Sequence, residues 1–260
     1  MRNVNPDDVE ATPRPAVAIG NDYPPQFELA RHSHRRAQLL YAAEGVITVD
    51  TEHGAWVVPP ERAVWIPAGV PHSVRMVGAV KTRSVLIEPA CCPARAAQCE
   101  VIVVSALLRS LLVEAAESPP EYDIDGRDGL VMALLMAEVN RAPTILLAVP
   151  FPKLPGLAAK CHAFLARPDA RVTIEDWCRD LNLERRTFTR LFRRQTGMSF
   201  AAWRQQACVL TALPRLAGGE TVTGVALDLG YDSPAAFATM FKRWLGVPPS
   251  HYQSETQAHI

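Results

Sequence analysis

The sequence predicts two domains: an all-β barrel with appended helices, followed by an all-α domain that contains two helix-turn-helix units. Three observations support this division. Short runs rich in Val, Ile, Trp and Tyr, punctuated by Gly and Pro, fill residues 17–90 and are typical of a barrel or sandwich. Apolar residues at helical spacing replace them after about residue 100. Residues 141–156 contain four prolines and indicate a linker between the domains.

The charge distribution also divides the chain into two parts. The 260 residues include 27 basic and 27 acidic residues. Residues 155–260 carry 13 Lys and Arg against 9 Asp and Glu, whereas residues 1–154 carry 14 against 18. This asymmetry indicates two modules with different partners.

The sequence gives no support for a membrane protein, a secreted protein or a disulfide-stabilised protein. No apolar run approaches the roughly 20 residues of a membrane span. The polar N-terminus does not resemble a secretory signal. The six cysteines form no C-x-x-C pair and are expected to be free thiols. We therefore expect a cytoplasmic protein without a membrane partner.

Residues 1–16 are polar and are predicted to form a mobile tail before the β domain, which we assign to residues 17–140. Two helices are expected near its end, over residues 107–115 and 130–139. Both are apolar nearly all round. They either pack against the barrel or form a subunit interface, which makes this a candidate dimerisation domain.

Three histidines stand out in the β domain. His32, His34 and Gln38 lie at alternate positions and would share one face of a strand, with Arg36 between them. His72 follows a predicted tight turn over residues 67–71. This pattern resembles the cupin motifs H-x-H-x(3)-E-x(6)-G and P-x-G-x(2)-H. The resemblance implies a small β-barrel in which the histidines and the glutamate bind a metal ion.

Gln38 takes the place of the cupin glutamate, which removes the only negative charge of the site and lowers its affinity for hard cations. Three histidines can still hold zinc, nickel or copper, with Gln38 or water completing the shell. The alternative is a ligand pocket without metal. The candidate effector-pocket residues are Arg36, Tyr41, Trp56 and Trp65. An inward Arg36 would favour an anionic or carbonyl-bearing ligand; the alternatives are solvent for Arg36 and core packing for the aromatic residues.

The helical domain, assigned to residues 157–254, begins with a strong helix start. Thr173 is a good N-cap with Asp176 at the third helical position, and Asn182 suits the turn that follows. The next helix, over residues 184–195, places Phe188 and Phe192 toward the core. Its opposite face holds a stripe of arginines that suits a DNA major groove, unless it is simply a solvated basic face.

A second unit repeats this pattern after a connecting helix over residues 200–216. Thr221 begins a helix, Gly230 makes the turn, and Ser233-Pro234 starts the last helix, over residues 235–245. Residues 173–252 resemble the DNA-binding domain of AraC-type (arabinose-regulator) transcription factors. The residues that carry the resemblance are Ile174-Glu175-Asp176, Arg190-Leu191-Phe192-Arg193, Thr196-Gly197-Met198-Ser199-Phe200, Ala226-Leu227-Asp228-Leu229-Gly230-Tyr231, Phe237, Phe241-Lys242-Arg243, Gly246-Val247-Pro248-Pro249 and Tyr252.

The resemblance implies that each unit inserts one helix into a major groove of promoter DNA. The candidate DNA contacts are Arg185, Arg186, Thr187, Thr189, Arg190, Arg193, Arg194, Ser233, Pro234, Ala235, Thr239 and Lys242. Base contacts fall on Arg186, Thr189 and Arg190. The second unit offers few long donors, so we expect it mainly to hold the backbone. Three positions depart from the family pattern: Glu184 in place of Ser, Pro214 inside the connecting helix, and Gln253 after Tyr252.

The leading interpretation is a bacterial transcription regulator, not an enzyme. It would be a homodimer that binds double-stranded DNA under the control of a small-molecule effector or metal, with RNA polymerase as a further candidate partner. The alternative is a metal-dependent cupin enzyme fused to a DNA-binding tail. A constitutive DNA-binding protein with an inert barrel is the third possibility.

Overall fold

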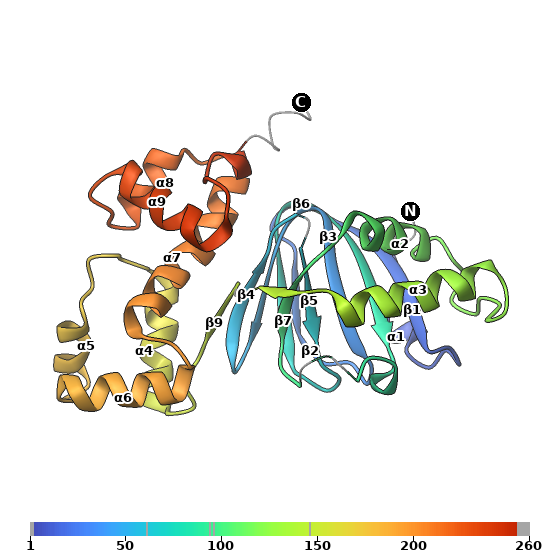
Figure 1. Cartoon of the computed structure of the whole chain (residues 1–260), viewed down its shortest axis with the longest axis horizontal. Coiled ribbons are helices and arrows are strands. Elements are labelled where there is room, and N and C mark those ends of the chain that lie inside the picture. Colours follow the sequence, from blue (N-terminus) through green and yellow to red (C-terminus); the bar gives the residue numbers. More distant parts are fainter. Residues whose placement is uncertain (1–2, 61, 94, 96, 146, 254–260) are drawn as a thin grey trace. The chain divides into compact units, whose positions relative to one another are not determined.

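The computed structural model of the chain describes residues 3–60, 62–93, 95, 97–145 and 147–253 (Figure 1). It contains two compact units, Met1–Thr51 with Trp56–Leu147, and Glu52–Ala55 with Ala148–Ile260. The predicted combination of a β domain with appended helices and an all-α domain is confirmed. None of the described helices is both long and apolar enough to cross a membrane.

The first unit is built on antiparallel pairing between two long strands, β3 (Ala37–Thr51) and β6 (His72–Ile87). Gly45 lies at irregularities in this pairing with a φ of 78°. A Cβ atom there would approach the Ala79 carbonyl oxygen to 2.5 Å, so only glycine fits. The same sheet includes β1 (Ala16–Tyr23), β2 (Glu28–His32), β4 (Gly54–Val58), β5 (Arg62–Ile66), β7 (Glu100–Val103) and β8 (Thr144–Ile145) among its strands. The strand order runs β1-β6-β3-β5-β7-β8, and β2 also pairs with β6.

Two helices, α2 (Ala106–Ala115) and α3 (Arg127–Arg141), cover one face of this sheet (Figure 1). Their buried residues Leu108, Leu112 and Leu135 join a hydrophobic cluster that includes Tyr41 and Trp65 of the sheet. Four large apolar side chains of the same helices remain exposed: Leu107, Val113, Leu130 and Leu134. The helices therefore pack on the sheet and also present an uncovered apolar surface.

Residues 3–15, the described part of the predicted mobile tail, contact the β domain. This segment contains a short helix, α1 (Pro6–Val9), whose Val9 packs against Val17 and Leu86. The Asn21 side chain also holds this segment, because it accepts from the Val4 amide at 2.6 Å and donates to the Val4 carbonyl at 3.0 Å. The low apolar content of residues 1–16 concealed these contacts, which depend on residues distant in sequence.

The predicted linker contains local structure. The strands β8 and β9 (Ala148–Pro150) lie within residues 141–156. Outside the linker, a short 3-10 turn, η1 (Pro89–Cys91), precedes β7. The helices of the second unit are α4 (Pro155–Ala166), α5 (Ile174–Asp180), α6 (Arg185–Thr196), α7 (Phe200–Ala217), α8 (Val222–Asp228) and α9 (Pro234–Leu245). The helix α7 continues through Pro214 to Ala217.

Aromatic side chains form much of the core of the second unit. Trp177 of α5 contacts Phe188 and Phe192 of α6, with ring centroids 6.1 Å apart in each pair. Trp177 also contacts Phe200 of α7 at 4.8 Å. Thr173 and Asp176 form the expected reciprocal capping box at the start of α5. These interactions determine which face of α6 is left for solvent.

Candidate DNA-binding face and histidine cluster

The exposed face of α6 carries a stripe of arginines. Phe188 and Phe192 are fully buried, so Arg186, Arg190 and Arg193 lie on the opposite side of the helix and are exposed. Among the described residues, the side chains of these three arginines and of Arg194 have no ion-pair or hydrogen-bond partner. Free guanidinium groups on one helix face are available for phosphate oxygens or guanine edges.

Three neighbouring residues on α6 differ from this stripe. Arg185 forms an ion pair with Glu175 of α5, at 2.7 Å between Nη1 and Oε1. Thr189 donates its hydroxyl to the Arg185 carbonyl at 2.8 Å. Thr187 is exposed. Arg185 thus braces α6 against α5, and the positive charge it presents to solvent is partly neutralised.

The corresponding helix of the second unit, α9, has a less basic surface. Ser233 caps it by accepting from the Ala236 amide at 3.2 Å, and Pro234 is half-buried in its first turn. Ala235, Thr239 and Lys242 are exposed. These three side chains are therefore accessible to DNA, whereas the Ser233 hydroxyl accepts the hydrogen bond that caps α9.

The turn between α8 and α9 packs against the loop before α5. The Ala170 amide donates to the Leu229 carbonyl at 2.7 Å, and Arg204 of α7 donates to the Val172 carbonyl. Gly230 has a φ of 76°, and a Cβ there would lie 2.1 Å from an Asp169 carboxylate oxygen. These contacts join the two helix-turn-helix units. The sequence does not reveal Asp169 and Arg204, because no local motif marks a contact between such distant segments.

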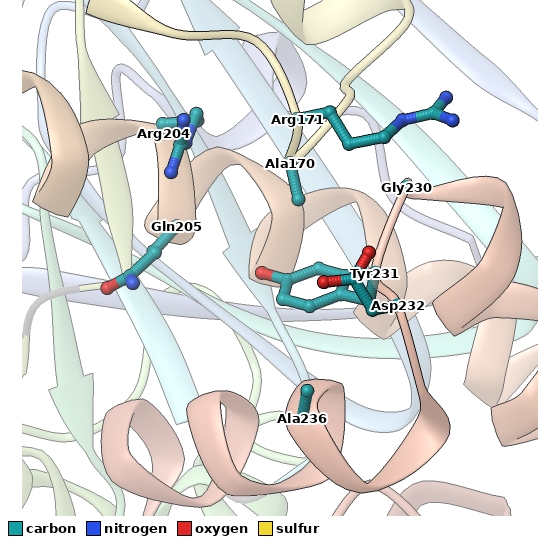
Figure 2. Close-up of a pocket in the computed structure, with 8 residues that line it drawn as sticks. All are labelled: Ala170, Arg171, Arg204, Gln205, Gly230, Tyr231, Asp232 and Ala236. Atoms are coloured by element: carbon teal, nitrogen blue, oxygen red, sulfur yellow. The ribbon is translucent and has the colours of Figure 1, made fainter.

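A cavity of about 220 Å³ lies at this junction (Figure 2). The Tyr231 ring forms part of its wall, whereas the Arg171 guanidinium points away from that ring and pairs with Asp169 at 2.8 Å. Burial raises the pKa of the Tyr231 hydroxyl, which therefore stays protonated near neutral pH. The residues that line the cavity are Ala170, Arg171, Arg204, Gln205, Gly230, Tyr231, Asp232 and Ala236.

In the first unit, His32, His34 and His72 form a cluster. His32 of β2 and His72 of β6 are register partners, and their ring centroids lie 4.4 Å apart. His34 follows β2. A backbone hydrogen bond fixes its position, because the Gly69 amide donates to the His34 carbonyl at 2.7 Å. One ring nitrogen from each histidine lies within 4.8 Å of the others.

The hydrogen bonds and burial of these histidines suit metal binding. Nδ1 of His32 lies 2.6 Å from the Ala30 carbonyl, and Nδ1 of His72 lies 2.9 Å from the Val70 carbonyl. Because a carbonyl only accepts, each Nδ1 carries the proton and leaves Nε2 with a free lone pair. Burial lowers the pKa of His72 to about 4, and burial followed by the charge of His32 lowers the pKa of His34. Neutral imidazoles are the form that binds metal.

Several of these polar atoms are buried without a hydrogen-bond partner in the part of the chain that the structure describes. They include Nε2 of His72 and both ring nitrogens of His34. Gln38 is also buried; its Nε2 donates to the Ser84 hydroxyl at 3.4 Å, while its Oε1 has no partner. An unpaired buried acceptor is costly, and a bound cation would satisfy these acceptors. The residues present therefore fit a divalent transition metal.

The strand geometry behind the sequence prediction was wrong. His32 ends β2 and β3 begins only at Ala37, so residues 32, 34, 36 and 38 do not lie on one strand. The two histidines converge because the chain turns between the strands. Arg36 does not continue the row of side chains that alternation predicted.

Arg36 points neither to a pocket nor to solvent. Its side chain is 1% exposed, donates to the Glu10 carbonyl at 3.0 Å and lies 3.1 Å from a carboxylate oxygen of Glu88. Tyr41 and Trp65 belong to the cluster beneath α2 and α3, which favours the core-packing alternative over a place in a pocket wall. Trp56 is buried, and its indole Nε1 has no hydrogen-bond partner among the described residues.

Comparisons with known proteins agree with both parts of this arrangement. Residues 14–135 match the model of an AraC-like ligand binding domain, and residues 177–255 match a helix-turn-helix domain. The chain is 34% identical to the HTH-type transcriptional regulator NimR of Escherichia coli over 221 residues, which cover 85% of this chain and 81% of NimR. It is 29% identical to the HTH-type transcriptional regulator RipA of Corynebacterium glutamicum, over 40% of this chain and 32% of RipA.

Solved structures that match the chain include ToxT from Vibrio cholerae bound to an unsaturated fatty acid. The sequence identity is 12%, the TM-score is 0.38, and the match covers 92% of this chain and 94% of ToxT. The DNA-binding domain of AdpA in complex with a target DNA is 31% identical, with a TM-score of 0.36, over 38% of this chain and 92% of that domain.

Proposed function

Because this chain belongs to the AraC family of DNA-binding transcription regulators, we propose that it binds promoter DNA through α6 and α9 under the control of a ligand in its β domain. Its relatives are transcription regulators, and the chain is a regulator, not an enzyme. These relatives contradict the alternative hypothesis of a metal-dependent cupin enzyme fused to a DNA-binding tail.

The unpaired arginines of α6 carry the DNA-binding proposal. Arg186 and Arg190 lie one helical turn apart on the same exposed face, so both can reach into one major groove. A guanidinium group can donate in bidentate fashion to O6 and N7 of guanine. Arg193 and Arg194 lie farther along the helix and suit phosphate contacts. Arg185 instead acts mainly as a positioning residue, through its ion pair with Glu175.

Selection of duplexes from a random DNA library by the full chain tests this proposal. We expect the recovered sites to contain two conserved blocks whose centres are separated by about 10 base pairs, one helical turn of DNA. Guanine should dominate the block that α6 reads. Recovery of duplexes without a common sequence would contradict specific binding.

The histidine cluster supports a metal ion as a regulatory ligand. His32, His34 and His72 would hold zinc, nickel or copper, with Gln38 or water as a further ligand. The metal would supply Lewis acidity and positive charge, and would satisfy ring nitrogens that have no protein partner. The metal would connect three segments, which are β2, the turn that follows β2, and the strand β6. An organic effector that binds these same groups would need hydrogen-bond donors.

The uncovered apolar surface of α2 and α3 supports a homodimer. Leu107, Val113, Leu130 and Leu134 are between 44% and 69% exposed, which is unusual for large apolar side chains gathered on two adjacent helices. A second copy of the chain would cover them, and a symmetric dimer would favour repeated half-sites in the operator. We place the protein in the bacterial cytoplasm, where RNA polymerase is a further candidate partner.

A further inference from the structure

The two groove-facing helices, α6 and α9, have the same internal framework. Phe188 and Phe192 in α6 correspond to Phe237 and Phe241 in α9, and all four side chains are buried. Each helix ends at a glycine in the left-handed conformation, Gly197 with a φ of 74° and Gly246 with a φ of 78°. This correspondence aligns the exposed faces of the two helices residue by residue.

The aligned faces differ in the chemistry they present. Arg186 corresponds to Ala235, Arg190 to Thr239 and Arg193 to Lys242, and all six residues are exposed. Both stripes therefore carry a cation at the third position. At the first two positions, α6 presents guanidinium groups where α9 presents small side chains.

The Thr239 hydroxyl is already used inside the helix, since it donates to the Ala235 carbonyl at 2.9 Å. The hydroxyl can then act toward a base only as an acceptor, and the methyl group is the part of the side chain that offers apolar contact. Residues four apart on a helix are neighbours, so the Ala235 methyl lies beside it. Together they form a small apolar surface where α6 has two charged donors.

We infer that the second helix-turn-helix unit reads DNA through the methyl groups of thymine, with Ala235 and Thr239 as its specificity-determining residues. Thymine presents a C5 methyl group in the major groove, and alanine and threonine methyls contact it. Lys242 holds the adjacent phosphate backbone. This inference rests on the proposed function and replaces the expectation that the second unit mainly holds the backbone.

The operator is then chemically asymmetric within each site. Guanines lie under α6, and one or two thymines lie under α9. Replacement of thymine by deoxyuracil removes only the methyl group and leaves base pairing intact. Loss of one buried methyl group corresponds to about fourfold weaker binding.

The test uses the full chain and a duplex that the wild-type chain selects from a random library. Each thymine is replaced in turn by deoxyuracil, and the dissociation constant is measured. We expect about fourfold weaker binding at one or two positions in the block read by α9. Unchanged binding at every position of that block, on a duplex that the chain still binds specifically, would overturn the inference. Failure to bind any duplex specifically would instead overturn the proposed function.

Two substitutions at one position separate the methyl from the hydroxyl. Thr239→Ser keeps the hydroxyl and removes the methyl, so this variant should show a smaller difference between thymine and deoxyuracil duplexes than the wild type, because only Ala235 still supplies a methyl. Thr239→Val keeps a methyl and removes the hydroxyl, so it should retain the fourfold difference. The opposite pattern would overturn the inference. Arg190→Ala is the control: it should weaken binding overall and leave the deoxyuracil effect unchanged.

Discussion

His32 and His72 face each other across the β2–β6 pair as register partners, with ring centroids 4.4 Å apart. Neighbouring main-chain carbonyls hold the Nδ1 atoms of both rings, which directs both Nε2 lone pairs away from those carbonyls. The Gly69 amide donates to the main-chain carbonyl of His34 and so holds His34 beside the other two histidines. The backbone thus organises these imidazoles as ligands without any acidic residue among them.

This geometry predicts that the chain binds one transition-metal ion. Protein prepared without a histidine tag should take up about one equivalent of zinc, measured by elemental analysis after dialysis. His32→Ala and His72→Ala should each abolish tight binding, because two imidazoles rarely suffice for zinc. His53→Ala is the matched control, because the exposed His53 lies outside the cluster. Equal zinc content in all four proteins would contradict the site.

The ion pair between Arg36 and Glu88 predicts a stability effect at the N-terminal segment. Glu88→Gln should lower the free energy of unfolding by about 1–3 kcal/mol, mainly because it leaves the buried Arg36 guanidinium without its carboxylate, and it also breaks the exposed pair between Glu88 and Arg35. Glu88 is about one-third exposed, so water replaces part of this interaction. Chemical denaturation measures the loss.

The same substitution should increase proteolytic cleavage within residues 3–15, since Arg36 holds the Glu10 and Thr12 carbonyls. Glu44→Gln, which breaks an exposed pair with Lys81, provides the control and should change neither measurement. An equal effect of both substitutions would show that the buried pair has no special role.

The exposed leucines of α3 predict the oligomeric state. Leu130→Glu combined with Leu134→Glu should convert a dimer to a monomer, because charge at a buried apolar interface is costly. Sedimentation equilibrium measures the mass. Leu227→Glu, at a leucine of similar exposure in α8, should leave the dimer intact. A wild-type chain that is already monomeric at micromolar concentration would contradict the interface.

The capping box of α5 predicts a pH-dependent contribution to stability. Hydrogen bonds from Thr173 lower the pKa of the Asp176 carboxyl below its ordinary value of 3.8. The folded state therefore binds fewer protons than the unfolded state near that pH, and the contribution is complete above pH 3.8 and lost as the pH falls through the lowered value.

Asp176→Asn should accordingly lower the melting temperature at pH 7, and the difference from the wild type should shrink below pH 4. Asp180→Asn is the control, because this exposed carboxylate lies in α5 but outside the cap. A difference between wild type and Asp176→Asn that is the same at pH 3 and pH 7 would contradict the assigned ionisation.

The helices of the second unit were predictable from the sequence because their signals are local. The caps Thr173 and Ser233 mark the starts of α5 and α9, and the aromatic spacing of Phe188 and Phe192 marks α6, so all three helices lie within about one residue of their predicted bounds. These features depend on residues within one or two helical turns. The side chains that face solvent follow from the same spacing.

The β domain was less predictable because its contacts are distant in sequence. Arg36 bonds to Glu10 and pairs with Glu88, and neither partner has a motif. The convergence of the histidines was predicted, but through alternation in a single strand, whereas the structure brings them together by a turn and a strand pair. For Tyr41 the sequence left a pocket wall and core packing both open, because it does not show which face of β3 the helices cover.

The claim that α6 reads bases is central, and the binding of Arg190→Ala tests it most directly. Dissociation constants of the wild-type and variant full-length chains are measured on the selected duplex and on a scrambled duplex, across a series of salt concentrations. We predict a loss of about 1–3 kcal/mol on the selected duplex and a much smaller loss on the scrambled one. An equal loss on both duplexes, with a shallower salt dependence, would show that Arg190 contacts only phosphate and would contradict the claim.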